Sequence, residues 1–196
     1  MNGLLKFSQG VDALNAWVGR WLSWLVLLMV LISAGNAIVR KVFSNSSNAF
    51  LEIQWYLFAA IFLLASAYTL LRNEHVKIDV VLGRFPRRTQ VKVEIFGLLV
   101  FLLPFVVYVS ALSWPEVHKA FVSGEVSENA GGLIRWPVYA LLPVGMALLG
   151  LQGLSEVVKR LAFLAGRAPD PSARQQAKTA EEELAEAIRK QSGSAA

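Results

Sequence analysis

Ionisable side chains stand at both ends of one long apolar stretch, residues 53–71, and they are the first candidates for chemistry in this sequence. Glu52 comes immediately before the stretch. The segment after it carries Arg72, Glu74, His75, Lys77 and Asp79. Carboxylates and histidines at the mouth of an apolar span could bind a metal ion, take part in ion movement or fix a contact with a partner protein.

A metal site or a haem is not expected. Carboxylates flank His75, but a metal site needs more ligands at suitable spacing. The only other histidine, His118, falls on the opposite side of the membrane in the topology below, which argues against a bis-histidine haem. The chain has no cysteine and therefore no disulfide, thiol chemistry or thioether-linked haem. No nucleophile–base pair or glycine-rich phosphate loop appears, so we expect neither an enzyme nor a cofactor.

The composition indicates an integral membrane protein. Of the 196 residues, 55% are hydrophobic and only 17% are charged, whereas an average globular chain has about 25% charged residues. Four runs carry no charge: residues 21–39, 53–71, 95–115 and 136–155. The shortest of them covers about 28 Å as a helix, enough to cross a bilayer core. We predict an all-α protein with four transmembrane helices, because these runs are too long and continuous for barrel strands.

The basic residues predict the orientation. With the N-terminus inside, 15 of the 19 Lys and Arg residues fall on the inner side of the membrane, as positive charge usually does. Both termini are therefore expected in the cytoplasm; the resemblance described below implies that the membrane is the inner membrane of a bacterium. The net charge of +5 could suggest nucleic acid, but the basic residues cluster around apolar runs, so we expect a lipid surface and no nucleic acid.

The same pattern divides the chain into three parts. Residues 1–20 have apolar side chains at spacings of three and four, which predicts an amphipathic helix on the membrane surface that ends in a turn at Gly19 and Arg20. A cleaved signal peptide is the alternative, although the apolar run is long and starts late for one. Residues 21–165 form the four-helix transmembrane domain, and residues 166–196 form a soluble cytoplasmic tail.

Small and helix-breaking residues predict how the helices pack. Ser33, Ala34, Gly35, Asn36 and Ala37 lie in the outer half of the first span. Small residues let another helix come close, and we expect that helix to belong to the same subunit, with a separate chain as the alternative. Pro104 should kink the third span. Residues 44–51 predict a short interfacial helix before the second span.

Further candidate contact residues lie at the helix ends and in the third loop. Glu52 could cap the interfacial helix or meet Arg40; a contact with a partner outside the bilayer is the alternative. Trp55 stands where an interfacial aromatic belt would place it. The loop that precedes Pro137 carries Glu125, Glu128 and Arg135, which a docking partner could contact. Pro137 suits the first turn of the fourth helix.

The order of these motifs resembles the small membrane subunit of tripartite ATP-independent periplasmic (TRAP) transporters, the DctQ-like family. The likeness covers residues 10–165. It rests on the length, the four spans, Asn36 with Arg40, the string Glu52–Trp55, and above all the string from Arg72 to Asp79. The third loop from Ser123 to Leu133 is similar to the branch of the family associated with keto acids and other monocarboxylates.

The resemblance implies a non-catalytic scaffold subunit of a sodium-coupled importer of organic acids. Its implied partners are a large membrane subunit that carries the transport sites, a periplasmic substrate-binding protein and the lipid bilayer. Within this role we expect Arg40, Glu52, Trp55, Arg72, His75 and Asp79 to fix helix ends and the partner interface. Glu125, Glu128 and Arg135 are expected on the docking face. The alternatives are a small homodimeric transporter that works alone and a membrane redox enzyme.

Overall fold

The protein is a bundle of long helices. A computed structural model describes residues 2–43, 48–73, 82–129 and 131–171. The elements in these ranges are α1 (Asn2–Phe43), α2 (Asn48–Arg72), α4 (Arg87–Gly97), the π-helix η1 (Leu98–Leu102), α5 (Leu103–Ser123) and α6 (Trp136–Leu164). In this part of the chain four helical stretches are long and apolar enough to cross a membrane, with α4, η1 and α5 counted as one. The prediction of an all-α protein with four spans is confirmed.

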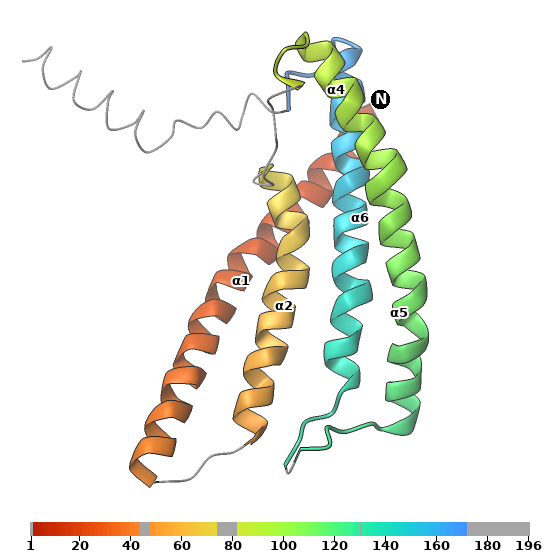
Figure 1. The fold of residues 1–196 in the computed structure, drawn as a ribbon. Coiled ribbons are helices and arrows are strands. Elements are labelled where there is room, and N and C mark those ends of the chain that lie inside the picture. The colour runs from red at the N-terminus through yellow and green to blue at the C-terminus, as the bar shows by residue number, and fades with distance from the viewer. Residues whose placement is uncertain (1, 44–47, 74–81, 130, 172–196) are drawn as a thin grey trace, which may run out of the picture.

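Helix α6 is at the centre of the bundle. The helices follow one another across Figure 1 in the order α1, α2, α6, α5, and α6 packs against α2 and α5. We call the end that holds residues 124–135 the loop end, and the end that holds the N-terminus of α1 and the C-terminus of α6 the tail end. Half of the apolar window of α6 is buried, against 11% or less in the other spans.

Glycines in α6 permit this close packing. A Cβ atom at Gly145 would lie 2.8 Å from the backbone oxygen of Leu63 in α2. A Cβ atom at Gly153 would lie 2.8 Å from the side chain of Leu102 in η1. Any larger residue would therefore push the neighbouring helices away. The small residues of the fourth span therefore serve packing within the subunit.

The N-terminal segment differs from the prediction. Helix α1 runs unbroken for 42 residues, so the chain does not turn at Gly19 and Arg20. Gly19 is instead a contact point, where a Cβ atom would lie 2.5 Å from the ring of Tyr68 in α2. At about 63 Å, α1 is about twice as long as a bilayer core is thick. Its N-terminal part packs against α6, so the segment belongs to the bundle.

The third span changes its helical geometry close to Pro104. The helix changes to π geometry over Leu98–Leu102, immediately before Pro104 in the first turn of α5. Proline has no N–H to donate to the carbonyl group four residues earlier. A π-helical turn is one of the usual rearrangements at such a break. The helical stretch is continuous from Arg87 to Ser123, and the kink expected at Pro104 stays a prediction.

The small residues of α1 also differ from the prediction. Ser33, Ala34 and Ala37 are exposed and line a groove, and a Cβ atom at Gly35 would meet nothing within 4 Å. Within this segment only Asn36 is buried inside the subunit; for the small residues around it, close packing within the subunit was the wrong expectation. Helix α2 begins at Asn48, so residues 48–51 belong to the second span instead of a separate interfacial helix. Residues 44–47 and the tail after 171 lie outside the described residues.

Candidate functional site at the loop end

Glu52 joins the second span to the third loop. Its Oε1 atom accepts hydrogen bonds from Ser127 Oγ and from Asn129 Nδ2, the latter at 2.7 Å. Its Oε2 atom accepts a bond of 2.7 Å from the backbone N–H of Leu133. Both carboxylate oxygens are therefore engaged by the loop. Glu52 was expected to cap a helix or to meet Arg40; it is bonded to the third loop instead.

The loop itself is held in a defined shape. Helix α5 ends at Ser123, and Gly124 follows in the left-handed conformation with φ of 63°, which glycine adopts without steric cost. Val126 and Ile134 then form an antiparallel bridge. The N–H of Arg135 donates to the carbonyl of Glu125 at 3.0 Å. Glu52 thus binds a folded hairpin-like turn rather than a loose connection.

A second polar contact fixes the exit of the loop. Arg135 lies 3.3 Å from a carboxylate oxygen of Glu125 and donates to the Tyr139 hydroxyl at 3.3 Å. The hydrogen bond to Tyr139, together with the charge of Glu125, raises the pKa of Arg135 above its ordinary value. The Tyr56 hydroxyl donates to the carbonyl of Ile134 at 3.2 Å, which adds another link to α2. Residues from α2, the loop and α6 therefore form one polar surface.

Three of the candidate residues are open to the surroundings at this end of the bundle. Glu128 is exposed on the loop, and Arg40 is exposed on the last turn of α1. Trp55 has 78% of its surface exposed, the largest fraction among the exposed large hydrophobic side chains of the described residues. The structure therefore gathers Glu52, Glu125 and Arg135 into bonded contacts with the loop and leaves Glu128, Arg40 and Trp55 free to meet something else.

The remaining candidates lie at the other end of α2. Arg72 donates to the Tyr68 hydroxyl at 2.9 Å, and its guanidinium group lies 5.4 Å from the centre of the Tyr68 ring. This contact fixes the end of the helix, as a cation over an aromatic face can. His75 and Asp79 lie outside the described residues. Their expected role at the partner interface stays a prediction.

The sequence analysis missed a polar network at the tail end. Buried polar side chains of α1 meet those of α6 there. Asn15 donates to Gln152 at 2.8 Å, and Gln152 donates to Asp12 at 3.0 Å and to Glu156 at 3.1 Å. Ser155 also donates to Asp12, at 2.9 Å. Asn15 and Gln152 are at most 1% exposed, so these bonds form away from water.

Ion pairs extend this network to α4 and to the segment after α6. Asp12 pairs with Lys159 at 3.0 Å, and Arg160 pairs with Glu156 and, at 2.7 Å, with Glu94 of α4. Arg87 at the start of α4 pairs with Asp170 at 2.6 Å. The tail end is therefore crosslinked by charged side chains from α1, α4 and α6.

A helical period in the polar residues was the signal for this network. Ser8, Asp12 and Asn15 of α1 are four and three residues apart. Gln152, Ser155 and Lys159 of α6 are three and four residues apart, so each set lies on one face of its helix. The segment was expected to lie on the membrane surface, with no contact between its polar face and the bundle. Leu4, Phe7 and Leu14 are exposed, while Ser8 and Asn15 on the polar face are buried against α6. An apolar environment around the bundle favours this arrangement, because polar groups there must find partners inside the protein.

Among the described residues, no three His, Cys, Asp or Glu side chains gather closely enough to hold a metal ion. The loop end presents carboxylates, a guanidinium group and an exposed indole. The tail end offers a stable anchor for α1.

Comparison with known proteins identifies the family. A family profile described as the DctQ component of tripartite ATP-independent periplasmic transporters matches residues 29–163. A comparison with curated proteins returned no match. The matched range covers more than half of the chain and includes the second half of the first span, the other three spans and the loop bound by Glu52. The chain belongs to the DctQ family, the small membrane subunits of tripartite ATP-independent periplasmic transporters.

Proposed function

We propose that this small subunit is a non-catalytic scaffold in a sodium-coupled importer of organic acids. It packs against the large membrane subunit and holds it in the bilayer, while its loop end helps a periplasmic substrate-binding protein to dock. In this proposal the loop end faces the periplasm and both termini lie in the cytoplasm. The transport sites lie in the large subunit.

The single observation that carries the proposal is the contact of Glu52 with the third loop. Two hydrogen bonds to side chains and one to the N–H of Leu133 hold the loop on α2. A docking surface needs such a fixed shape, because ordering a loose loop during binding costs affinity. Glu128 and Trp55 stay exposed beside it and are available to a partner.

The charge distribution supports a static role. The four apolar runs contain no Asp, Glu, Lys or Arg, whereas ion pathways normally place such residues within the membrane. The ionic network at the tail end is satisfied by its own members and ties α1, α4 and α6 together. A bundle braced in this way suits a subunit that stays still while a transport domain moves.

The small homodimeric transporter is a weaker candidate. It needs an acid that can bind and release an ion or a proton, and Glu52 at the mouth of the second span was the nearest candidate. Both of its oxygens are occupied by the loop. Release of Glu52 for transport would therefore require the loop to open in each cycle.

Reconstitution distinguishes the two functions. The chain is placed in liposomes alone, with the large subunit, and with the large subunit plus the binding protein, and uptake of radiolabelled organic acids is measured with and without a sodium gradient. The proposal expects uptake only with all three components and a sodium gradient. Uptake by this chain alone would favour the homodimeric transporter and overturn the scaffold function.

A further inference from the structure

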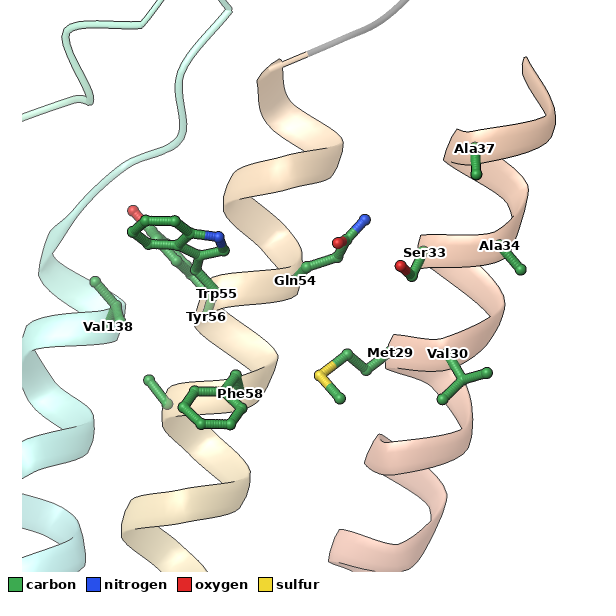
Figure 2. Close-up of a pocket in the computed structure, with 11 residues that line it drawn as sticks. Met29, Val30, Ser33, Ala34, Ala37, Gln54, Trp55, Tyr56, Phe58 and Val138 are labelled. Atoms are coloured by element: carbon green, nitrogen blue, oxygen red, sulfur yellow. The ribbon is translucent and has the colours of Figure 1, made fainter. Parts of the chain in front are cut away.

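A large apolar groove opens between the loop-end halves of α1 and α2. Its volume is about 1020 Å³, at the upper end of the range for ligand pockets. Met29 and Ser33 of α1 point towards α2 in Figure 2, and Gln54 of α2 points towards α1. Phe58 of α2 and Val138 of α6 also line the groove. Side chains of this protein leave the space between the two helices unfilled.

The groove has the depth of one membrane leaflet. Met29 lies in the middle of the charge-free run 21–39, and Ala37 lies near its end. The eight steps from Met29 to Ala37 rise about 12 Å along a helix, close to the thickness of about 15 Å that half a bilayer core has. The groove therefore runs from about the midplane to the headgroup level at the loop end.

A positive charge follows the groove-lining residues of α1 towards the loop end. Arg40 follows Ala37 by three residues and Ser33 by seven, so all three share one face of α1. Arg40 is exposed and comes immediately after the charge-free run, at the level where phosphate groups lie. Lys41 follows it in the last turn of the helix. An apolar channel with a cation at its polar end matches the chemistry of a phospholipid.

We propose that a phospholipid of the leaflet at the loop end binds in this groove. One acyl chain lies between α1 and α2 against Met29, Ser33 and Ala37, and the phosphate group meets Arg40. The lipid fills space that the subunit cannot fill by itself and holds the two helices at their present separation. This proposal does not depend on the transport function.

A helix of another protein is the other occupant to consider, because small residues on α1 would admit one. The cation at the mouth favours the lipid. A transmembrane helix would bring its own apolar surface to the headgroup level, whereas a phospholipid brings a phosphate group to Arg40. The experiment separates the two.

The test measures how many phospholipids remain bound to the purified full-length chain. The protein in mild detergent is titrated with phosphatidylglycerol, and native mass spectrometry counts the retained lipid. The wild type is expected to retain one lipid more tightly than the others. The double variant Ser33→Leu with Ala37→Leu fills the groove, and we expect this retention to fall about tenfold, as a lost apolar site of this kind implies.

A second variant leaves the groove open and removes only the charge. Arg40→Gln should weaken retention about fivefold, the factor that one basic residue near an anionic lipid surface provides. Gly35→Leu is the control for added bulk, because Gly35 lies on another face of α1 with nothing within 4 Å of its Cβ position. Arg20→Gln is the control for lost charge, at the other end of the same apolar run. Both controls should retain lipid like the wild type.

Two outcomes overturn the proposal. The first is equal retention by the wild type, the groove-filling variant and Arg40→Gln. The second is a groove-filling variant that loses a co-purifying membrane protein while its lipid retention is unchanged, which would assign the groove to a protein helix. Since Arg40→Gln changes an exposed side chain, it tests the proposal even if the groove-filling variant fails to fold.

Discussion

Glu52 shows how one side chain can organise an end of the molecule. The sequence pointed to it as an isolated acid at the mouth of an apolar run. That prediction has a physical basis, because a carboxylate in such a place is unfavourable in free energy unless it is hydrogen-bonded. Its partners, Ser127, Asn129 and the N–H of Leu133, lie 75 or more residues further along the chain. No local pattern reveals a contact of that range.

Replacing Glu52 with Ala should release the loop. Exchange of the Leu133 amide hydrogen is expected to rise about tenfold, because a charged acceptor is lost. In cells with the complete transporter, uptake should fall while the affinity of the binding protein for its substrate stays the same. Hydrogen exchange with mass spectrometry and an uptake assay check the two parts.

Glu116→Ala is the matched control, since Glu116 is an exposed acid near the same end of the bundle. Exchange of the Leu133 amide hydrogen should not change in this variant.

Asp79→Ala is predicted to reduce uptake as well, through the other end of α2. Wild-type uptake in both Glu52→Ala and Asp79→Ala would contradict their proposed roles.

Gln152 makes a second residue-scale prediction, because it is fully buried and bonded to Asn15, Asp12 and Glu156. Gln152→Leu should destabilise the protein by about 1–3 kcal/mol, the usual cost of buried polar groups left without partners. Asn15→Leu should do the same. Thermal unfolding in detergent gives the change for each variant.

The double variant tests whether the two amides act as a pair. Asn15→Leu with Gln152→Leu should cost less than the two single changes together, with a coupling of about 0.5–3 kcal/mol. Strict additivity of the two changes would show that the hydrogen bond between them does not stabilise the fold.

At the scale of the elements, the charge-free runs predicted the four spans because length and hydropathy are local properties. The first turn of α6 at Pro137 could also be read from the sequence, and the structure agrees. The packing of the segment from Ser33 to Ala37 could not be read from the sequence. Small residues permit a close neighbour, but they do not say whether that neighbour is in the same chain.

The long α1 helix illustrates a second limit. Its first 20 residues have an amphipathic pattern that fits a membrane surface as well as a bundle with its polar face inward. Which face is buried depends on whether a partner for Asp12 and Asn15 exists, and that partner is α6. The glycine and arginine at 19–20 suggested a turn only because a short surface helix was assumed.

Helix packing around α6 gives an element-scale prediction. Gly145→Ala adds a Cβ atom 2.8 Å from the backbone oxygen of Leu63, so α2 must move away. We expect a loss of about 1–3 kcal/mol, as for other overpacked positions. The midpoint of thermal unfolding measures it.

Gly97→Ala is the comparison, because a Cβ atom there meets nothing within 4 Å. It should be neutral or stabilise the helix by up to about 1 kcal/mol. If Gly145→Ala is as stable as Gly97→Ala, then α2 and α6 do not pack as closely as the structure indicates.

At the scale of the whole molecule, the orientation rests on the distribution of basic residues. The chain contains no cysteine, so a single introduced cysteine reports its own position. Glu128→Cys in the third loop should react with a membrane-impermeant maleimide in intact spheroplasts. Ser194→Cys near the C-terminus should react only after lysis. The reverse pattern would invert the topology and remove the loop from any periplasmic partner.

The central claim is that the chain works as a scaffold for a larger transport subunit, and co-purification tests it most directly. The tagged chain is expressed in its native membrane, solubilised gently and purified, and the proteins that accompany it are identified. The account predicts a stable complex with a large membrane protein of many spans, weakened by changes at Arg72 or Asp79. A homodimer without such a partner would contradict it.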